Sequence, residues 1–447
     1  MPIRVGMISL GCPKNQVDAE IMLARLHDEN YVLTPDVSSA DVVVINTCGF
    51  IEDAKKESIE NILEMAQLKK EGKIKGIVVT GCLAQRYFKE MEQEFPEVSC
   101  ILSVGSAGAI AQAVKAAYEN KKLNLYEAPE KLEISGKRVK TTLPFYSYLK
   151  IAEGCNNRCS YCIIPYLRGR YRSRPIEELV NEAKELAEGG VKELILVAQD
   201  TTRYGEDLYH KLALPQLLRE LCKIEKLKWI RILYCYPDMV TDELIDVIAN
   251  EEKIVKYIDL PIQHVSPRIV KAMNRRDTKE DLEALIKKLR EKIPGVILRT
   301  TLIVGFPGET EEDFALLDEF VREIKFDRLG VFTYSQEEGT PAAVMPNQID
   351  EEVKARRQEI IMETQSQIVE SKNNAMIGKT IEVLCEGYDK HAGYCYGRSA
   401  ADAPEIDGKV FFTAKKRPAA GEFVNVRITD VCDYDLTGEA VLEKWRE

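Results

Sequence analysis

The sequence predicts a mixed α/β protein built from three parts in succession. Two of these parts alternate strand and helix patterns, which indicates parallel sheets covered by helices. The third consists of short alternating runs separated by turn signals, which is typical of a small β-barrel. A chain of 447 residues is also long enough for about three domains of ordinary size.

Residues 1–120 are expected to form an N-terminal parallel α/β domain. Its strand candidates are IRVGMISL, DVVVINT and GIVVTG, with helical patterns between them, and each strand is followed directly by a cysteine: Cys12, Cys48 and Cys82. The carboxyl ends of parallel strands share one edge, and ligands bind there. We therefore expect the three thiols to converge on a metal or cluster site, with three buried structural cysteines as the alternative.

A second α/β series is expected over residues 141–372, after a linker near 120–142 that has no clear apolar period. Its strand candidates are FYSYLKIAE, ELILVAQ, WIRILYCY, YIDLPIQ, VILRTTLIVGF and RLGVFTY, and a long charged helical pattern over 350–372 ends it. Six strands alternating with helices predict a barrel or partial (βα)6 barrel, whose chemistry is carried by the loops after the strands.

Residues 376–447 are expected to form a small β-barrel of the OB kind. The alternating runs TIEVLCEG, KVFFTA and EFVNVRITDV are divided by the turn signals Asp407-Gly408 and Ala420-Gly421. Ten Lys and Arg stand against thirteen Asp and Glu in this part, a net charge of −3, and the whole chain carries −11. A negative net charge disfavours binding to nucleic acid through the release of phosphate counterions. A local basic patch would still permit such binding.

The composition of the chain excludes several further classes of function. Twelve cysteines without an export signal indicate a reducing, cytoplasmic location, where thiols serve as metal ligands or redox groups. No run approaches the ~18 apolar residues of a spanning helix, so no membrane partner is expected. None of the four histidines stands in an H-E-x-x-H helix or near a G-x-S-x-G elbow. Hydrolytic triads and zinc-protease chemistry are therefore excluded, and no side chain is singled out as a catalytic acid or base.

The strongest local signal is AEGCNNRCSYC, where Cys155, Cys159 and Cys162 follow the first strand of the second series at C-x₃-C-x₂-C spacing. Three thiolates this close together can hold three irons of a 4Fe-4S cube and leave the fourth iron open. Structural zinc prefers four ligands in paired knuckles, and the sequence has no partner knuckle. A ferredoxin-type carrier would need a fourth cysteine nearby, and Cys222 lies sixty residues further on.

With Tyr161 before its last cysteine, this motif resembles that of the radical S-adenosylmethionine enzymes. The resemblance implies that the open iron binds the amino and carboxylate groups of S-adenosylmethionine, whose reductive cleavage releases a 5′-deoxyadenosyl radical. Such a radical abstracts hydrogen from an unactivated carbon. No side-chain base with a pKa tuned near neutrality could remove that hydrogen as a proton.

Several strand ends resemble the cofactor-binding segments of that superfamily. AQDTT closes the second barrel strand, DLPIQ ends a later one, and FTYSQEEGT follows the last. TTLIVGFPGE is similar to an adenine-binding G-x-I-x-G-x-x-E motif, with threonine in place of the first glycine. Simple packing at strand ends is the alternative for each segment. The resemblance implies that S-adenosylmethionine is contacted by Tyr161, Gln199, Thr201, Gln263, Thr301, Gly305 and Tyr334.

A basic run, RGRYRSR, follows the cluster motif and contains Arg168, Arg170, Arg172 and Arg174. A solvated basic loop is the simplest interpretation. The alternative is that guanidinium groups balance the charge of a thiolate-bound cluster, or clamp a carboxylate of substrate or cofactor.

The combination of a three-cysteine α/β domain, a radical S-adenosylmethionine barrel and a terminal barrel of the TRAM type resembles the methylthiotransferases over essentially all 447 residues. The resemblance implies that Cys12, Cys48 and Cys82 bind a second 4Fe-4S cluster, whose open iron carries the sulfur to be inserted. The segments GCPKN and AQDTTRYG resemble those members that modify an aspartate β-carbon in ribosomal protein S-twelve. The expected partners are then that ribosomal protein, an electron donor such as a flavodoxin or ferredoxin, and a sulfur donor.

Two other functions stay open from the sequence alone. One is a tRNA adenosine methylthiotransferase, which the acidic charge balance disfavours, whereas a basic ribosomal protein would complement it. The other, from a different class, is an RNA-binding regulatory protein with structural iron-sulfur clusters. Such a regulator would have no reason to keep an open iron at both clusters.

Overall fold

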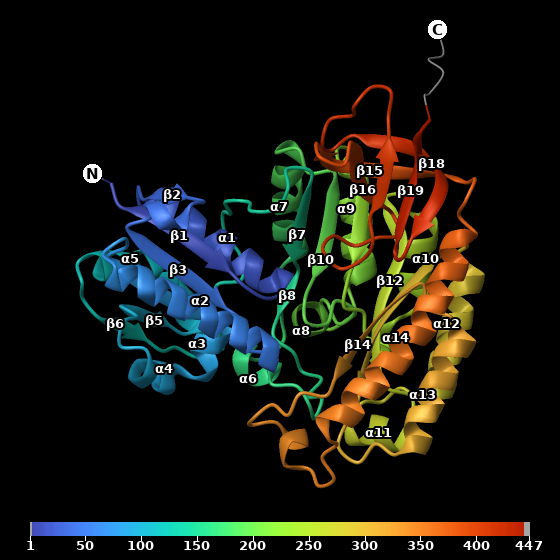
Figure 1. The fold of residues 1–447 in the computed structure, drawn as a ribbon, viewed down its shortest axis with the longest axis horizontal. Coiled ribbons are helices and arrows are strands. Elements are labelled where there is room, and N and C mark those ends of the chain that lie inside the picture. Colours follow the sequence, from blue (N-terminus) through green and yellow to red (C-terminus); the bar gives the residue numbers. More distant parts are fainter. Residues whose placement is uncertain (1, 442–447) are drawn as a thin grey trace.

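Two six-stranded parallel sheets, one closed barrel and a small antiparallel sheet of two strands, β8 and β9, form the protein in a computed structural model that describes residues 2–441 (Figure 1). This architecture confirms the fold class predicted from the sequence. Among the described residues, no helix is both long and apolar enough to cross a membrane.

The N-terminal domain is a parallel sheet with strands in the order β2-β1-β3-β4-β5-β6. One apolar core lies between one face of the sheet and helices α1 and α5, and a second lies between the opposite face and α2, α3 and α4. Strands β3 and β4 are buried along their whole length because helices cover both faces. The elements are β1 Arg4–Ser9, α1 Pro13–Asp28, β2 Val32–Thr34, η1 Val37–Ser39, β3 Val42–Thr47, α2 Glu52–Lys70, β4 Gly76–Gly81, α3 Cys82–Arg86, α4 Phe88–Glu94, β5 Cys100–Leu102, η2 Val104–Ala109, α5 Ile110–Tyr118 and β6 Leu123–Leu125.

The structure departs from the expectation of a linker over residues 120–142. Strand β6 lies inside that stretch and extends the edge of the N-terminal sheet by pairing with β5, and Pro129–Lys131 forms the short helix η3. A strand of three residues is too short to show the alternation of apolar and polar residues that identifies longer strands.

The central part is a partial barrel with parallel strands in the order β14-β13-β12-β11-β10-β7. Strands β7 and β14 are the two edges of this sheet. Helices cover its outer face around one large apolar core, and α14 runs along α13 toward the terminal barrel (Figure 1). The elements are β7 Tyr146–Lys150, β8 Ala152–Glu153, α6 Ile164–Arg168, β9 Arg172–Ser173, α7 Ile176–Glu188, β10 Glu193–Val197, α8 Glu206–Tyr209, α9 Leu214–Cys222, β11 Trp229–Ile232, η4 Pro237–Met239, α10 Asp242–Asn250, β12 Ile254–Gln263, α11 Pro267–Ala272, α12 Lys279–Lys292, β13 Ile297–Val304, α13 Glu311–Ile324, β14 Arg328–Thr333, η5 Pro341–Val344 and α14 Glu351–Asn374.

The C-terminal part is a closed five-stranded barrel, with strands in the order β15-β16-β17-β19-β18. Its interior is filled by apolar side chains of the alternating runs, including Val383, Val410 and Phe412. The strands are β15 Thr380–Asp389, β16 Tyr394–Ser399, β17 Val410–Thr413, β18 Phe423–Cys432 and β19 Asp435–Ala440.

The terminal barrel docks against the amino ends of the central strands. Arg398 donates to Glu193, the first residue of β10, at 2.7 Å. Arg328, the first residue of β14, donates to Asp402 at 2.6 Å. The terminal barrel therefore lies at the opposite end of the central barrel from the loops that follow its strands.

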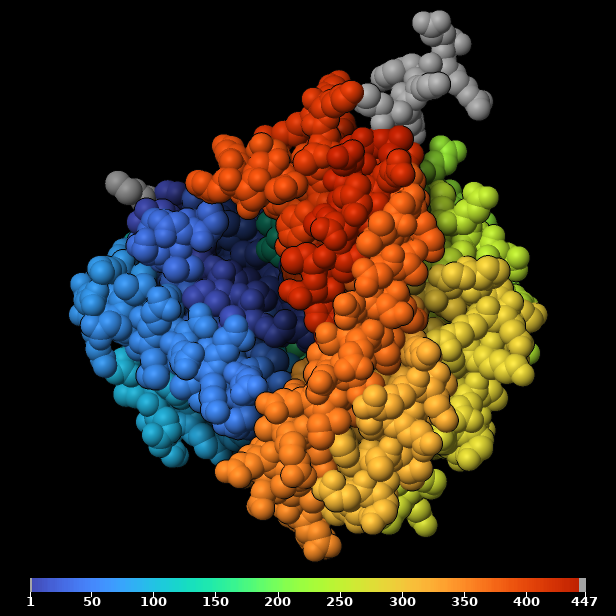
Figure 2. Space-filling model, turned by 45° about the vertical axis from the view of Figure 1, so that its right-hand side comes forward, coloured from blue at the N-terminus to red at the C-terminus, as the bar shows by residue number. Residues whose placement is uncertain are grey.

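The N-terminal domain spans the open side of the partial barrel. Helix α1 packs against the edge strand β7, where Val17 and Ile21 join the aromatic cluster of that strand. At the other edge, Lys55 and Arg86 pair with Glu337, in the loop after β14. Figure 2 shows the N-terminal domain, in blue, and the terminal barrel, in red, on either side of a hollow in the surface.

Candidate active site

The thiols of Cys12, Cys48 and Cys82, here called the N-terminal triad, follow three neighbouring strands, β1, β3 and β4. Two glycines bring these strand ends together. Gly11 has φ +87°, and a Cβ placed on it would lie 2.8 Å from the Cys48 Sγ. Gly81 has φ +95°, and its Cβ would lie 2.4 Å from the backbone oxygen of the residue before Cys48. Only glycine permits both the conformation and the approach.

The N-terminal triad is a close group of thiols in a largely buried place. Burial raises the pKa of Cys48 to about 12, and the nearby Cys82 and Cys12 thiols contribute. Burial also raises the pKa of Cys82, an effect that Arg168 opposes and Cys12 supports. Cys12 is the N-cap of the 16-residue helix α1, and the dipole of that helix favours negative charge at this end.

The second group, Cys155, Cys159 and Cys162, lies in the loop between β8 and α6 and is called the barrel triad. Burial raises the pKa of Cys155 to about 11, and the neighbouring Cys159 contributes to this shift. Cys159 is also in hydrogen-bond contact with a side chain that the sequence did not single out, the hydroxyl of Tyr236, at 3.0 Å. The barrel triad therefore contains the three closely spaced thiols that the motif predicts.

The donor set of both triads fits iron-sulfur cubes. No group of three or more His, Cys, Asp or Glu within residues 2–441 has the geometry of a site for one metal ion. A cube instead binds each thiolate to a different iron, so its ligands stand further apart than those of a single ion. Three thiols at each site, buried or half-buried, suit a cube with one iron left open.

The two triads are neighbours in space. Cys82 packs against Ile163 and Leu167, which directly follow the barrel triad, and α3 lies against α6. The two triads belong to separate domains in the prediction from the sequence, so their adjacency was not predicted. It arises because the N-terminal domain covers the open side of the barrel.

Three of the expected cofactor residues, Gln199, Gln263 and Tyr334, have a buried polar atom without a hydrogen-bond partner. The Oε1 atoms of Gln199 and Gln263 are buried and have no hydrogen-bond partner. Gln263 is the last residue of β12, and Gln199 lies two residues after the end of β10. A buried amide oxygen without a partner is costly to maintain, so both positions fit a polar ligand at the strand ends.

Tyr161 and Tyr334 lie on one apolar cluster near the barrel triad. Tyr334 belongs to this cluster, with its ring 5.5 Å from that of Phe306 in an edge-to-face arrangement, and Tyr161 packs against the cluster from outside. Burial raises the pKa of Tyr334 to about 12, so its hydroxyl remains protonated at neutral pH. This apolar group thus brings the loop of the barrel triad and the residue after β14 together.

The other three expected cofactor residues differ in whether their side chains are free to contact a cofactor. Thr201 is fully buried and donates its hydroxyl to the backbone oxygen of Leu233 at 2.8 Å, so this hydroxyl is used within the protein. Thr301 is half-buried on β13. Gly305 has φ +73°, and a Cβ there would lie 2.3 Å from the Cγ of Lys354, so no side chain fits.

The basic run after the barrel triad is not a uniformly solvated loop. Arg168 and Arg174 are buried, Arg172 is half-buried, and only Arg170 is exposed. The Nε atom of Arg168 donates to the Sγ of Cys82 at 3.2 Å. The interpretation as a solvated loop is therefore wrong for Arg168 and Arg174, and Arg168 fits the alternative of a guanidinium beside a thiolate.

Several polar residues around the triads were missed. Lys14 and Asp18 are buried on α1, and Lys14 lies over the ring of Tyr234, 3.4 Å from its centroid. Glu153, also buried, accepts hydrogen bonds from Gln199 and Lys150. A signal was available for two of them, because Lys14 and Asp18 are four residues apart and so share one helix face.

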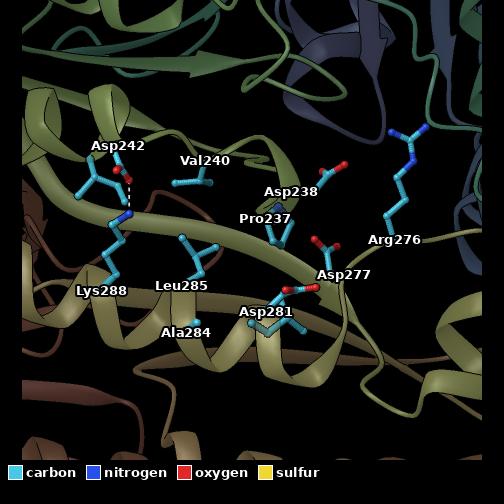
Figure 3. Close-up of a pocket in the computed structure, with 12 residues that line it drawn as sticks. Pro237, Asp238, Val240, Asp242, Arg276, Asp277, Asp281, Ala284, Leu285 and Lys288 are labelled. Atoms are coloured by element: carbon cyan, nitrogen blue, oxygen red, sulfur yellow. Dashed lines mark hydrogen bonds and ion pairs between the residues drawn. The ribbon is translucent and has the colours of Figure 1, made fainter.

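A cavity of about 400 Å³ lies on the outside of the barrel, against η4, α10 and α12. The carboxylates of Asp238, Asp277 and Asp281 lie together in it, while Arg276 extends away from them (Figure 3). None of the expected cluster or cofactor residues lines this cavity.

The comparisons with known proteins cover all three parts of the chain. Residues 4–103 match the uncharacterized protein family UPF0004, residues 149–321 the radical SAM superfamily, and residues 377–441 the TRAM domain. Among the solved structures, the radical S-adenosylmethionine methyltransferase TsrM of Kitasatospora setae, with cobalamin and a [4Fe-4S] cluster bound, superposes with a TM-score of 0.57 at 16% identity over 77% of both chains. This likeness concerns the fold alone.

Full-length relatives are much closer in sequence. A protein of Caldanaerobacter subterraneus subsp. tengcongensis, named ribosomal protein uS12 methylthiotransferase RimO, is 55% identical over 97% of this chain and 99% of its own length. A Clostridioides difficile protein of the same name is 50% identical over 99% of both chains. The chain therefore belongs to the RimO-type radical S-adenosylmethionine methylthiotransferases, whose cofactors are S-adenosylmethionine and two 4Fe-4S clusters.

Proposed function

We propose that this chain adds a methylthio group to the β-carbon of an aspartate in ribosomal protein uS12. The observation that carries the proposal is the adjacency of the two triads, through the packing of Cys82 on Ile163 and Leu167. A reaction that joins a carbon radical to a sulfur atom needs both reagents at one place. The name of the full-length relatives supports this substrate.

In this proposal the triads have different roles. Cys155, Cys159 and Cys162 hold the cluster that takes S-adenosylmethionine, and Cys12, Cys48 and Cys82 hold the cluster that takes the sulfur. When bound and reduced, the first cluster and S-adenosylmethionine together supply a radical able to abstract hydrogen from carbon. The work of the chain is to place the substrate carbon between the two sites and to exclude water.

The cofactor is held, in this proposal, by the strand-end residues of the barrel. The free oxygens of Gln199 and Gln263 accept hydrogen bonds from its polar groups. Tyr161 and the backbone at Gly305 form the apolar side. The unpaired hydroxyl of Tyr334 and the half-buried Thr301 of β13 add two polar groups. Thr201 orients its loop through its bond to a backbone oxygen and acts indirectly.

Charge favours a basic protein substrate over tRNA. The chain has a net charge of −11, and its terminal barrel −3. A tRNA is bound largely through its phosphates, which this balance opposes. A ribosomal protein rich in Lys and Arg would instead be drawn to an acidic enzyme surface.

The remaining partners follow from the chemistry. The reaction needs reducing equivalents, for which a flavodoxin or ferredoxin is a suitable donor, and a source of sulfur. All twelve cysteines are free thiols in the structure, and such thiols persist in the reducing cytoplasm, where ribosomal proteins are made.

The test is incubation of the reconstituted enzyme with S-adenosylmethionine, reductant, sulfide and purified uS12, followed by mass spectrometry. We expect a mass gain of about 46 Da, which replaces hydrogen by CH₃S on one aspartate. Methylthio-adenosine in tRNA together with unmodified uS12 would contradict the proposal.

One observation favours tRNA as a second candidate. Lys415, Lys416 and Arg417 are all exposed on the loop between β17 and β18, a small basic patch on the acidic barrel. If RNA is the substrate, replacing the three by alanine should lower tRNA modification and reduce its salt dependence. We expect the same variant to modify uS12 at the unaltered rate.

A further inference from the structure

We propose that Arg168 is a positioning residue that joins the two cluster sites, holding the Cys82 ligand from the segment that follows the barrel triad and raising the reduction potential of the N-terminal cluster. The proposal rests on the cluster assignment of the proposed function. It does not depend on which macromolecule is modified.

The Arg168 side chain is 2% exposed and reaches into the N-terminal domain with all three nitrogens. Its Nε donates to the Sγ of Cys82 at 3.2 Å, and its Nη2 donates to the Oδ1 of Asn15 at 2.9 Å. Its Nη1 contacts the carboxylates of Asp18 and Glu153. Arg168 ends α6, only six residues after the last cysteine of the barrel triad. The Arg168 side chain therefore connects Cys82, of the N-terminal triad, to the segment that follows the barrel triad.

The carboxylates around Arg168 are already balanced. Lys150 is fully buried and contacts Asp18 and, at 2.8 Å, Glu153, so two cations face two carboxylates. The net charge of these four side chains is thus close to zero. The Nε–H of Arg168 remains available to donate to the Sγ of Cys82.

The same group extends to the cofactor side. Glu153 accepts a hydrogen bond from the Nε2 of Gln199 at 2.6 Å. The free Oε1 of Gln199 is one of the atoms assigned above to S-adenosylmethionine. A continuous series of contacts therefore runs from Cys82 through Arg168 and Glu153 to Gln199, and fixes the distance between the two sites.

A cationic hydrogen-bond donor to a ligand sulfur should raise the reduction potential of the cluster that this sulfur binds. Reduction adds negative charge to the cluster and its thiolates, and a buried N–H···S bond from a guanidinium stabilises that charge. Loss of the bond should therefore lower the reduction potential. Lysine cannot replace it, because one ammonium lacks the planar set of donors that reaches Cys82, Asn15 and the carboxylates at once.

The decisive variant is Arg168→Met, made in a chain that also carries Cys155→Ala, Cys159→Ala and Cys162→Ala, so that only the N-terminal cluster of about four irons is present. The midpoint potential is measured by redox titration followed by electron paramagnetic resonance. We expect a more negative potential than in the parent triple variant. Because Arg168→Met leaves buried carboxylates with one cation, the paired variant Arg168→Met/Asp18→Asn keeps the test available if the single variant does not fold.

Arg174→Met is the matched control. Arg174 lies in the same basic run, is equally buried, and pairs with Glu178 at 2.8 Å and Glu182 at 2.6 Å, with no thiol among its partners. Its removal should leave the potential unchanged. An unaltered potential in the Arg168 variants, or an equal shift in Arg174→Met, would overturn the proposal.

In the chain with both triads, Arg168→Lys should still form 5′-deoxyadenosine while yielding several-fold less methylthio product per cofactor cleaved. Unchanged coupling in that variant would contradict the positioning role. Should the potential shift as expected while uS12 remains unmodified by the unaltered enzyme, the proposed substrate fails and the assignment of Arg168 stands.

Discussion

The thiols of the barrel triad come from one loop of eight residues, whereas those of the N-terminal triad come from three strands and span residues 12–82. The loop needs only its local sequence to bring Cys155, Cys159 and Cys162 together. The N-terminal triad depends on the sheet order, on two glycines with positive φ, and on an arginine from another domain. A cluster site with dispersed ligands is therefore a property of the whole fold.

The surroundings of the two triads differ as well. The N-terminal triad has a guanidinium donor, Arg168, and the barrel triad has a phenol, Tyr236. Among the described residues, buried side-chain atoms without a partner occur in the barrel and its following helix, and none occurs in residues 2–120. Three of these atoms, on Gln199, Gln263 and Tyr334, belong to residues that the proposal assigns to S-adenosylmethionine. The two sites should separate cleanly in their response to mutation.

The largest effect is expected from Cys155→Ala. Loss of one thiolate from the barrel triad removes the open iron that takes S-adenosylmethionine, so formation of 5′-deoxyadenosine should cease. Chromatography of the reaction after reduction measures it. Cys235→Ala, a buried cysteine of the same barrel outside both triads, is the control and should keep the activity. Cleavage by the Cys155 variant at the unaltered rate would remove the distinction between the triads.

Replacement of Cys12, Cys48 and Cys82 by alanine should have the complementary result. Anaerobically reconstituted enzyme should contain about eight irons, and this variant about four. It should still form 5′-deoxyadenosine and fail to attach a methylthio group, because the sulfur site is gone. Loss of all iron, or of none, would contradict the assignment of a separate cluster to each triad.

Much of this organisation follows from the sequence. The strands β1, β3 and β4 and the six barrel strands are long enough to show their patterns, and parallel topology then puts Cys12, Cys48 and Cys82 at one edge. The C-x₃-C-x₂-C spacing identifies the barrel triad without any structure. Strands β2, β5 and β6, of three residues each, carry no such pattern.

The contacts between domains could not be predicted in the same way. The place of Arg168 beside Cys82 depends on how α6 packs against α3 of the N-terminal domain, and no local pattern encodes that packing. A basic run in a sequence is most often solvated, so burial of Arg168 and Arg174 contradicts the usual pattern. Likewise, the hydroxyl of Thr201 turns to a backbone oxygen, which only the folded loop reveals.

Gly81→Ala should have a smaller, selective effect on the dispersed triad. An alanine there would suffer both the strain of φ +95° and a 2.4 Å approach to a backbone oxygen. Together these should cost roughly 1–3 kcal/mol of local stability. We expect lower iron occupancy at the N-terminal site and normal formation of 5′-deoxyadenosine.

The control for backbone strain is Gly190→Ala. Gly190 has φ +99°, and its Cβ would meet nothing within 4 Å. This variant has the backbone strain without the close contact, and Gly190 lies in the loop before β10, at the amino ends of the central strands, away from the loop of the barrel triad. Equal iron loss in the two variants would mean that the close packing of the strand ends does not hold the triad together.

The smallest effect is expected from Gln263→Leu, which tests whether this barrel residue binds S-adenosylmethionine. The change keeps the approximate size of the side chain and removes the buried, unpartnered Oε1. If that oxygen accepts a hydrogen bond from S-adenosylmethionine, its loss should cost about 0.5–1.5 kcal/mol of binding, a several-fold weaker affinity. Equilibrium binding to the reconstituted enzyme measures it. Gln365→Leu is the matched control, since Gln365 has the same unpartnered atom but lies on α14, and an equal loss of affinity there would remove Gln263 from the cofactor site.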